Sequence, residues 1–138
     1  MMAFFLMCAL SNGGFPLATV SRGAMSSIDE PSQPVVRTQA EWVALWKRHG
    51  SGQPLPGIDF QAQMVVGVFL GARPSAGYSV EIVEVRKSGD GLIVEYREAK
   101  PGPDRMAAQI VTAPFHLVSL DRQDGAVTFV ALKTSSKS

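Results

Sequence analysis

The sequence predicts a mainly β protein of the α+β class. We expect an antiparallel sheet of about six or seven strands, curled or packed on itself as a sandwich, with one N-terminal helix packed on it. Between residues 60 and 132, short apolar or alternating segments are separated by connections that contain Gly, Pro or Asp, as is typical of strands joined by hairpins. Only residues 39–49 have a clear helical period.

Length and charge limit the possible functions. The chain has 138 residues, enough for one domain, and a formal net charge of +1. Its Lys and Arg residues are scattered, which argues against nucleic acid and acidic membrane surfaces as partners. A single cysteine, Cys8, rules out an intrachain disulfide. With only two histidines, His49 and His116, we expect no metal site and no other cofactor.

Residues 1–34 are predicted to be a leader and a flexible linker. Met1–Leu10 is almost wholly apolar and has the length of a signal-peptide core. Residues 11–34 are rich in Ser, Gly and Pro, and Leu17–Ser21 is the candidate cleavage stretch. We therefore expect an extracytoplasmic protein, in the periplasm, in the cell envelope or secreted, without an integral membrane domain. The alternative is a cytoplasmic protein whose true start is Met25.

The folded region is expected to open with an extended segment at 35–37 and a helix at 39–49. Thr38–Glu41 has the form of a capping box, and Gly50 provides a stop. One helical face carries the large side chains Trp42, Leu45, Trp46 and His49. The tryptophans invite a carbohydrate-stacking interpretation, but their place on the single apolar stripe favours anchors that hold the helix on the sheet. His49 lies at the negative end of the helix, where a cation is favoured.

The strands follow from residue 60 onward. Met64–Leu70 is a short, β-branched apolar run, which predicts a strand buried on both faces. In the next strand, 79–85, the apolar positions change face near Ile82, which predicts a bulge. Lys87–Gly91 reads as a hairpin connection into a strand at 92–97 with one wet face.

The last third of the chain is less regular. Pro101–Asp104 breaks the chain, and 106–111 is predicted to be a weak strand. Thr112–Phe115 interrupts that strand with a proline. Strands are expected at 116–120 and 126–132, and the polar residues 133–138 form a tail.

Two loops are the candidate binding surface. Residues 71–78 connect two strands, and a rigid scaffold lets such loops bind with little loss of entropy. Arg, Tyr and Phe are common interface anchors; the alternative for Tyr78 is that it packs over the sheet edge. The predicted partner-binding residues are Arg73, Pro74, Ser75, Gly77, Tyr78, Pro114 and Phe115. No nucleophile has a plausible histidine partner, so we expect no catalytic residues and no enzyme.

The order of these segments resembles a known family. After the Trp-containing helix come Val65–Gly71, Gly77–Ile82, Leu92–Val94 and Thr112–Val118. This series is similar to the C-terminal domain family of PrcB, a subunit of a bacterial surface protease complex, over roughly Val35–Leu132. The resemblance implies an exported, non-enzymatic domain that accompanies or stabilises a protease. The expected partner is thus a protein, a protease among the candidates, and the oligomeric state is left open.

A looser likeness connects the two loops to chagasin-type cysteine-protease inhibitors. Gly71–Tyr78 and Ala113–Phe115 are similar to two loops that those inhibitors insert into a protease cleft. The initial Asn of the first loop and the Arg before the proline of the second are absent here. Protease inhibition through loops 71–78 and 113–115 is the alternative function. In either case the expected division is a leader and linker at 1–34, a PrcB C-terminal-like β domain at 35–132 and a tail at 133–138.

Overall fold

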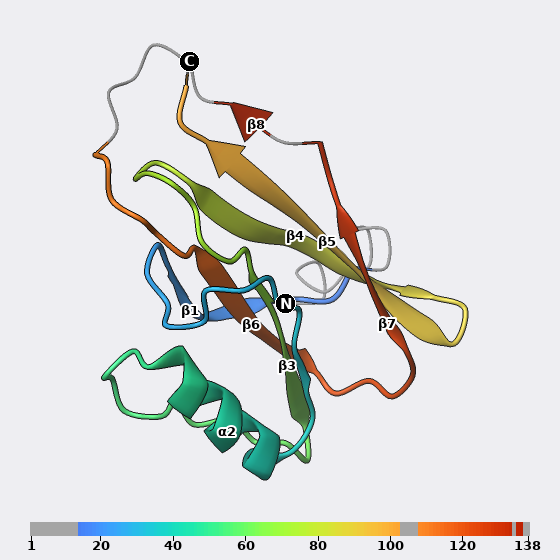
Figure 1. The fold of residues 1–138 in the computed structure, drawn as a ribbon. Helices are drawn as coiled ribbons and strands as arrows, with labels where there is room; N and C mark the ends of the chain where they lie inside the picture. The colour runs from blue at the N-terminus through green and yellow to red at the C-terminus, as the bar shows by residue number, and fades with distance from the viewer. Residues whose placement is uncertain (1–13, 103–107, 134, 137–138) are drawn as a thin grey trace, which may run out of the picture.

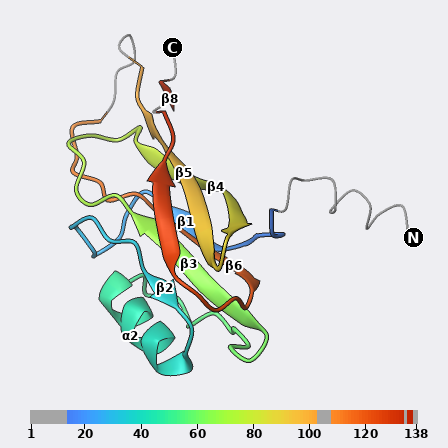
Figure 2. The same cartoon turned by 90° about the vertical axis from the view of Figure 1, so that its right-hand side faces the viewer.

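The computed structural model describes residues 14–102, 108–133 and 135–136. Within them the fold is mostly β, with two stacked sheets and one helix (Figures 1 and 2). The predicted fold class is therefore confirmed. The elements in chain order are β1 (Ala18–Gly23), β2 (Val35–Val36), α2 (Gln39–His49), β3 (Gln63–Phe69), β4 (Ser79–Ser88), β5 (Gly91–Lys100), β6 (Phe115–Asp121), β7 (Val127–Ala131) and β8 (Ser135–Ser136).

The first sheet has the strand order β1-β6-β3-β2, and all of its neighbours are antiparallel. The second sheet has the order β4-β5-β7, with β8 also paired to β5. Here β4 and β5 form an antiparallel hairpin, whereas β7 and β8 run parallel to β5. The parallel pairs arise because the chain leaves the second sheet after β5, adds β6 to the first sheet, and then returns. The prediction of a mainly antiparallel protein holds, with this exception.

Strand β3 lies between two cores, as its apolar run predicts. Its residues Met64, Val66 and Val68 pack between the sheets with residues of β4, β5 and β6. Its residues Val65 and Phe69 face the other way, into a second core beneath α2. The molecule thus has three layers, and both faces of the first sheet are buried.

Helix α2 begins and ends where the sequence predicts. Thr38 is the N-cap and its side chain accepts a hydrogen bond from the Glu41 amide at 3.2 Å. Gly50 ends the helix in a left-handed conformation, with φ of 65°. Trp42 and Trp46 are buried, and their indole N–H groups donate to carbonyls of the following loop. This confirms their role as anchors of the helix.

The predicted linker is wrong from residue 14 onward. Residues 18–23 form β1, which pairs with β6 along its length. Residues 24–31 then connect β1 to the opposite edge of the first sheet, and residues 32–34 pair with the end of β3. There Ile28 is buried, and the Ser32 and Phe69 backbones exchange two hydrogen bonds of 2.8 and 2.9 Å. The folded domain therefore begins well before residue 35. The apolar run Met1–Leu10 lies outside the described residues.

Three smaller predictions have mixed outcomes. The bulge is confirmed, because the β4–β5 register shifts between Ile82 and Glu84. The hairpin at 87–91 is also confirmed. Ala108–Val111 is not a strand, and the remainder of that predicted strand lies outside the described residues. The predicted tail is partly wrong, because β8 pairs with Ala99 and Lys100 of β5.

Candidate functional site

The 71–78 loop is a rigid corner on the surface. Arg73 and Thr112 exchange two backbone hydrogen bonds of 2.7 and 2.9 Å, and the Thr112 hydroxyl donates to the Ser75 carbonyl at 2.9 Å. Gly77 has a φ of +98°, and a Cβ at this position would lie 2.9 Å from the Pro101 Cβ. Only glycine therefore fits this turn without strain. Pro74 and Gly77 are exposed, whereas Arg73, Ser75 and Tyr78 are half-buried.

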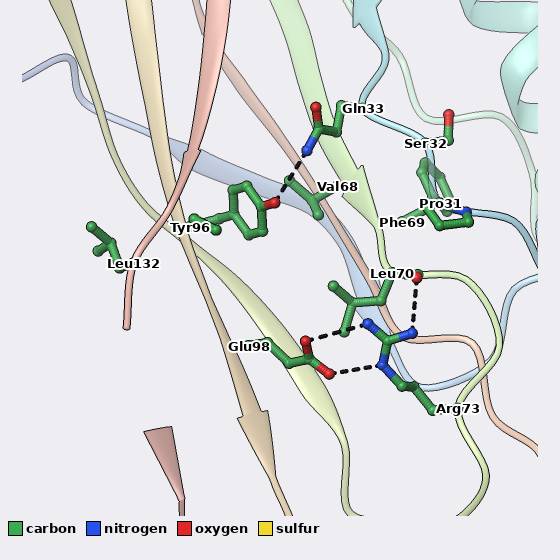
Figure 3. A pocket seen from close by; sticks show the side chains of 11 residues that line it. Pro31, Ser32, Gln33, Val68, Phe69, Leu70, Arg73, Tyr96, Glu98 and Leu132 are labelled. Atoms are coloured by element: carbon green, nitrogen blue, oxygen red, sulfur yellow. Dashed lines mark hydrogen bonds and ion pairs between the residues drawn. The ribbon is translucent and has the colours of Figure 1, made fainter. Parts of the chain in front are cut away.

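Arg73 ties this corner to the second sheet. Its guanidinium donates to both carboxylate oxygens of Glu98, at 2.7 and 3.3 Å, and to the Leu70 carbonyl at 3.1 Å (Figure 3). It also donates to the Ala72 carbonyl at 3.1 Å. The hydrogen bond with Glu98 raises the pKa of Arg73. Four of its five N–H donors are used within the chain. Arg73 therefore positions the loop, and little of its donor capacity remains for a partner.

Pro114 and Phe115 are not part of the surface, which corrects the prediction. Both are buried, and Phe115 is only 5% exposed. As the first residue of β6, Phe115 points beneath α2, where its ring stacks on Phe69 and meets the His49 ring edge-on at 4.3 Å. The backbone here is still near the corner, because the Pro114 carbonyl accepts from the Leu70 amide at 3.0 Å.

Other apolar side chains take their place. Ile110 is 53% exposed and Val111 is 66% exposed, and they directly precede Thr112. Met25 is also exposed and follows Ala24, whose carbonyl accepts from the Ala113 amide at 2.8 Å. Exposed apolar residues on adjoining loops are a sign of an interaction site. We call the set Met25, Pro74, Tyr78, Ile110 and Val111 the corner surface.

The sequence did not reveal Ile110 and Val111 because their β-branched character predicted a strand. A strand prediction assigns alternate residues to a buried face and thereby hides them as surface candidates. The cue that could have found them is Pro114, which ends regular pairing just downstream.

A groove of about 450 Å³ lies beside the corner, between the two sheets (Figure 3). Its floor includes Val68 and Leu70 of the β3 end, and its walls include Tyr96, Glu98 and Leu132 of the second sheet. The segment before β2 closes it on the other side, where the Gln33 side-chain amide donates to the Tyr96 hydroxyl at 3.2 Å. The groove is lined by apolar and polar surface in similar amounts, and its two charged groups, Arg73 and Glu98, are paired with each other.

His116 is a structural residue between the sheets. It is 4% exposed, and its Nδ1 accepts from the Ile82 amide at 2.9 Å, while its Nε2 lies 3.0 Å from the Thr19 hydroxyl. An Nδ1 that accepts a backbone proton belongs to a neutral ring that carries its proton on Nε2. Burial, with a smaller contribution from the charge of Arg22, lowers the pKa of His116 to about 4. The ring thus joins β6 to β1 and β4.

His49 forms a pair with Ser26 that the sequence did not suggest. Its Nδ1 lies 2.7 Å from the Ser26 hydroxyl, as in a nucleophile–base pair. However, the ring is 1% exposed and contacts Trp46, Phe69 and Phe115, and its Nε2 has no hydrogen-bond partner among the described residues. Burial lowers the pKa of His49, so the expected helix-end cation is wrong. The pair anchors residues 26–28 to α2.

The described residues contain no group of three or more His, Cys, Asp or Glu side chains placed to hold a metal ion. In the same ranges, no helix is long and apolar enough to cross a membrane.

One part of the chain matches a known family. Residues 64–121 match the family model described as PrcB C-terminal. This segment runs from β3 to β6 and covers less than half of the chain. No curated protein and no solved structure matches the chain. The match suggests a protease-complex-associated domain, and the four central strands of this chain are similar to the PrcB C-terminal family.

Proposed function

We propose that the chain is a non-enzymatic, exported protein-binding domain that associates with a protease or another cell-envelope protein through the corner surface. The observation that carries this proposal is the exposure of Ile110 and Val111 on a loop that is hydrogen-bonded to the 71–78 corner. The corner is held by backbone pairs and by Arg73, so little conformational freedom is lost when a partner binds. The match to the PrcB C-terminal family supports a protease complex as the setting.

A non-enzymatic role is supported by the state of the two histidines. His49 and His116 are the only imidazoles of the chain, and both are buried. His116 uses both nitrogens in contacts between strands, and His49 is sealed beneath the helix by aromatic rings. Neither ring can reach a substrate without opening a core.

Protease inhibition of the chagasin type is less well supported. That mechanism needs two exposed loops, but Ala113, Pro114 and Phe115 are buried. A partner that contacts the corner surface does not have to enter a protease cleft. Titration of papain-like and subtilisin-like enzymes with the pure protein separates the two functions, because only an inhibitor lowers their activity.

Export is proposed from the apolar run Met1–Leu10. The fold adds a condition to this proposal. The candidate cleavage stretch Leu17–Ser21 overlaps β1, and the Phe15 amide already donates to the Val85 carbonyl at 2.8 Å. Cleavage before Gly14 keeps all the contacts described here, whereas a chain that starts at Met25 lacks β1. Mass spectrometry of the mature N-terminus tests this condition.

The binding proposal is tested by capture from the native cell envelope, with quantification of the captured proteins. The variant Ile110→Ser/Val111→Ser should reduce recovery of the specific partner at least about tenfold, since buried apolar anchors dominate interface energies. The matched control is Val43→Ser, which replaces a valine that is 45% exposed on α2. Circular dichroism verifies that both variants are folded. Equal recovery with the two variants would refute the corner surface as the binding site.

A further inference from the structure

Strand β7 is an edge strand of the second sheet, and no strand of the described residues pairs with its outer edge. Its two ends are bonded to β5: the Leu92 amide donates to the Ala126 carbonyl at 2.8 Å, and the Leu132 amide donates to the Tyr96 carbonyl at 2.7 Å. Because successive residues of a strand direct their backbone groups to opposite sides, the N–H and C=O groups of Val127, Phe129 and Ala131 point away from β5. No described strand pairs with them, and β7 lies at the front of the molecule in Figure 2.

This edge lacks the usual protection against pairing. Exposed edges commonly carry a charged residue, a proline or a bulge. The sequence of β7 is Val-Thr-Phe-Val-Ala, with none of these, and its pairing with β5 is regular. Three residues with free backbone donors and acceptors at a spacing of two match one ligand chemistry, namely another extended polypeptide.

The groove lies at the end of the same edge. Ala131 and Leu132 line it, together with Val68, Leu70 and Tyr96. A residue that pairs directly with Ala131 places its side chain on the same face of the sheet as the Ala131 side chain. That face is the one that lines the groove. The edge therefore provides backbone hydrogen bonds, and the groove provides a site for one side chain of the same segment.

We propose that an extended segment of a protein partner adds to β7 as a further strand of the second sheet and places an uncharged side chain in the groove. This inference rests on the proposed protein-binding function and gives it a second contact surface. The charges in the groove support an uncharged side chain, because Arg73 and Glu98 already neutralise each other and a third charge would be unpaired.

A second copy of the chain fits this site less well. Two β7 strands can pair in an antiparallel way about Phe129, which brings Val127 of one copy opposite Ala131 of the other. The Val127 side chain, however, packs against the core of its own molecule. A second copy would therefore pair with the edge but leave the groove unfilled, whereas a free peptide segment can occupy both.

The probe for this proposal is a displayed library of linear nine-residue peptides, selected on the full chain. We expect enriched peptides to alternate apolar and polar residues. In the complex, hydrogen exchange should slow at least about tenfold at the amides of Val127, Phe129 and Ala131, which face away from β5. The amides of Thr128 and Val130, which face β5, should change much less. This pattern is a direct signature of strand addition and requires no mutation.

Two variants test the edge and the groove separately. Ala131→Pro removes one outward amide without touching a bond to β5, and Gln33→Trp fills the groove from the opposite wall; each should weaken binding of the selected peptides about tenfold. The control Val83→Lys alters an exposed valine on β4, the other edge strand of the second sheet, and should leave binding unchanged.

The proposal is overturned if selected peptides protect other amides, or if no peptide is enriched. It is also overturned if the three amides become protected only as the protein concentration rises and sedimentation shows a dimer, because the occupant is then a second copy. If these results appear while Ile110→Ser/Val111→Ser still reduces partner capture, strand addition fails and the corner surface stands. If peptides bind β7 but the Ile110→Ser/Val111→Ser variant captures the partner normally, strand addition stands and the corner surface fails.

Discussion

The two edges of the second sheet differ in how well they are covered. On one side, the outer edge of β4 is covered by three groups: the Phe15 amide binds the Val85 carbonyl, the Arg22 side chain binds the Val80 carbonyl at 3.0 Å, and His116 accepts from the Ile82 amide. On the other side, β7 has no such cover among the described residues, and the groove opens beside it. Figure 1 places β4 and β7 at opposite edges of the second sheet.

The difference arises because the N-terminal segment lies on only one of these two sides. The segment from Gly14 to Gly23 supplies β1 to the first sheet and also covers the edge of the second. The two sheets are thereby joined on the covered side by hydrogen bonds as well as by the core. On the uncovered side, the Arg73–Glu98 pair and the Gln33–Tyr96 bond make the comparable connections, and both are partly exposed. Changes on the covered side should therefore cost more stability.

The largest effect is expected from removing the covering segment. A chain that begins at Met25 lacks β1 and the three contacts of Phe15, Thr19 and Arg22 with β4 and His116. We expect a loss of more than about 4 kcal/mol in the free energy of unfolding, enough to abolish a cooperative transition. Thermal unfolding followed by circular dichroism measures this. A chain that begins at Gly14 is the control, and equal stability of the two would show that the covering contacts carry no weight.

The next effect comes from His116. Replacement by Leu leaves the buried Ile82 amide without its acceptor and separates β6 from β4. The expected loss is about 3 kcal/mol in urea unfolding, which is the cost of a buried, unsatisfied donor together with the lost Thr19 contact. His116→Gln retains an acceptor oxygen and should lose less. If Gln and Leu are equally destabilising, the hydrogen bond to Ile82 is not what matters.

The same residue predicts a pH dependence. The folded pKa of His116 is about 4 and its ordinary value is 6.5, so the unfolded chain binds more protons between these values. The stability that neutral His116 contributes is complete above pH 6.5 and is lost as the pH falls toward 4. The total loss in the free energy of unfolding is about 3 kcal/mol. His49, whose pKa is also lowered, adds in the same direction. Urea unfolding at several pH values measures the slope.

In the His116→Leu variant this slope should be smaller, because His49 is then the one histidine that still contributes to it. A slope identical to that of the natural chain would mean that His116 is already charged in the fold, and its assignment as the acceptor for Ile82 would be wrong.

The smallest effect is expected on the uncovered side. Arg73→Met removes the ion pair with Glu98 but leaves the backbone pairs of the corner in place. Because the pair is partly exposed, the expected loss is about 1 kcal/mol, seen as a shift of the urea midpoint with an unchanged slope. Arg86→Met is the matched control, since Arg86 pairs with Glu95 at 3.1 Å on the outer face of β5 and should cost less. If Arg73→Met lost more stability than His116→Leu, the uncovered side would contribute more to stability than the covered side, contrary to this comparison.

Local chemistry made parts of this fold predictable. Thr38 and Gly50 mark the ends of α2, the apolar run of β3 indicates burial on both faces, and the change of face near Ile82 indicates the bulge. Each of these features is written within about ten residues of sequence. They depend on capping, alternation and turn chemistry, which act at short range.

The features that escaped prediction depend on distant partners. The sequence of β1, Ala-Thr-Val-Ser-Arg-Gly, has little apolar content, and it becomes a strand because β6 offers it an edge. The direction in which Phe115 points is set by the helix above the sheet, so the sequence could not separate a buried ring from an exposed anchor. The corner residues Arg73–Tyr78 were predictable as a loop, whereas the exposure of Ile110 and Val111 was missed because a strand was predicted there.

Only part of the groove lining lies within the segment that matches the family. Its floor residues Val68 and Leu70 and its wall residues Tyr96 and Glu98 belong to the segment that matches the PrcB C-terminal family. Pro31–Gln33 on one side and Ala131–Leu132 on the other lie outside that segment. Two chains that share the four central strands can therefore carry different rims. The side chain that the groove accepts would then depend on the two ends of the sequence, while the four central strands stay the same.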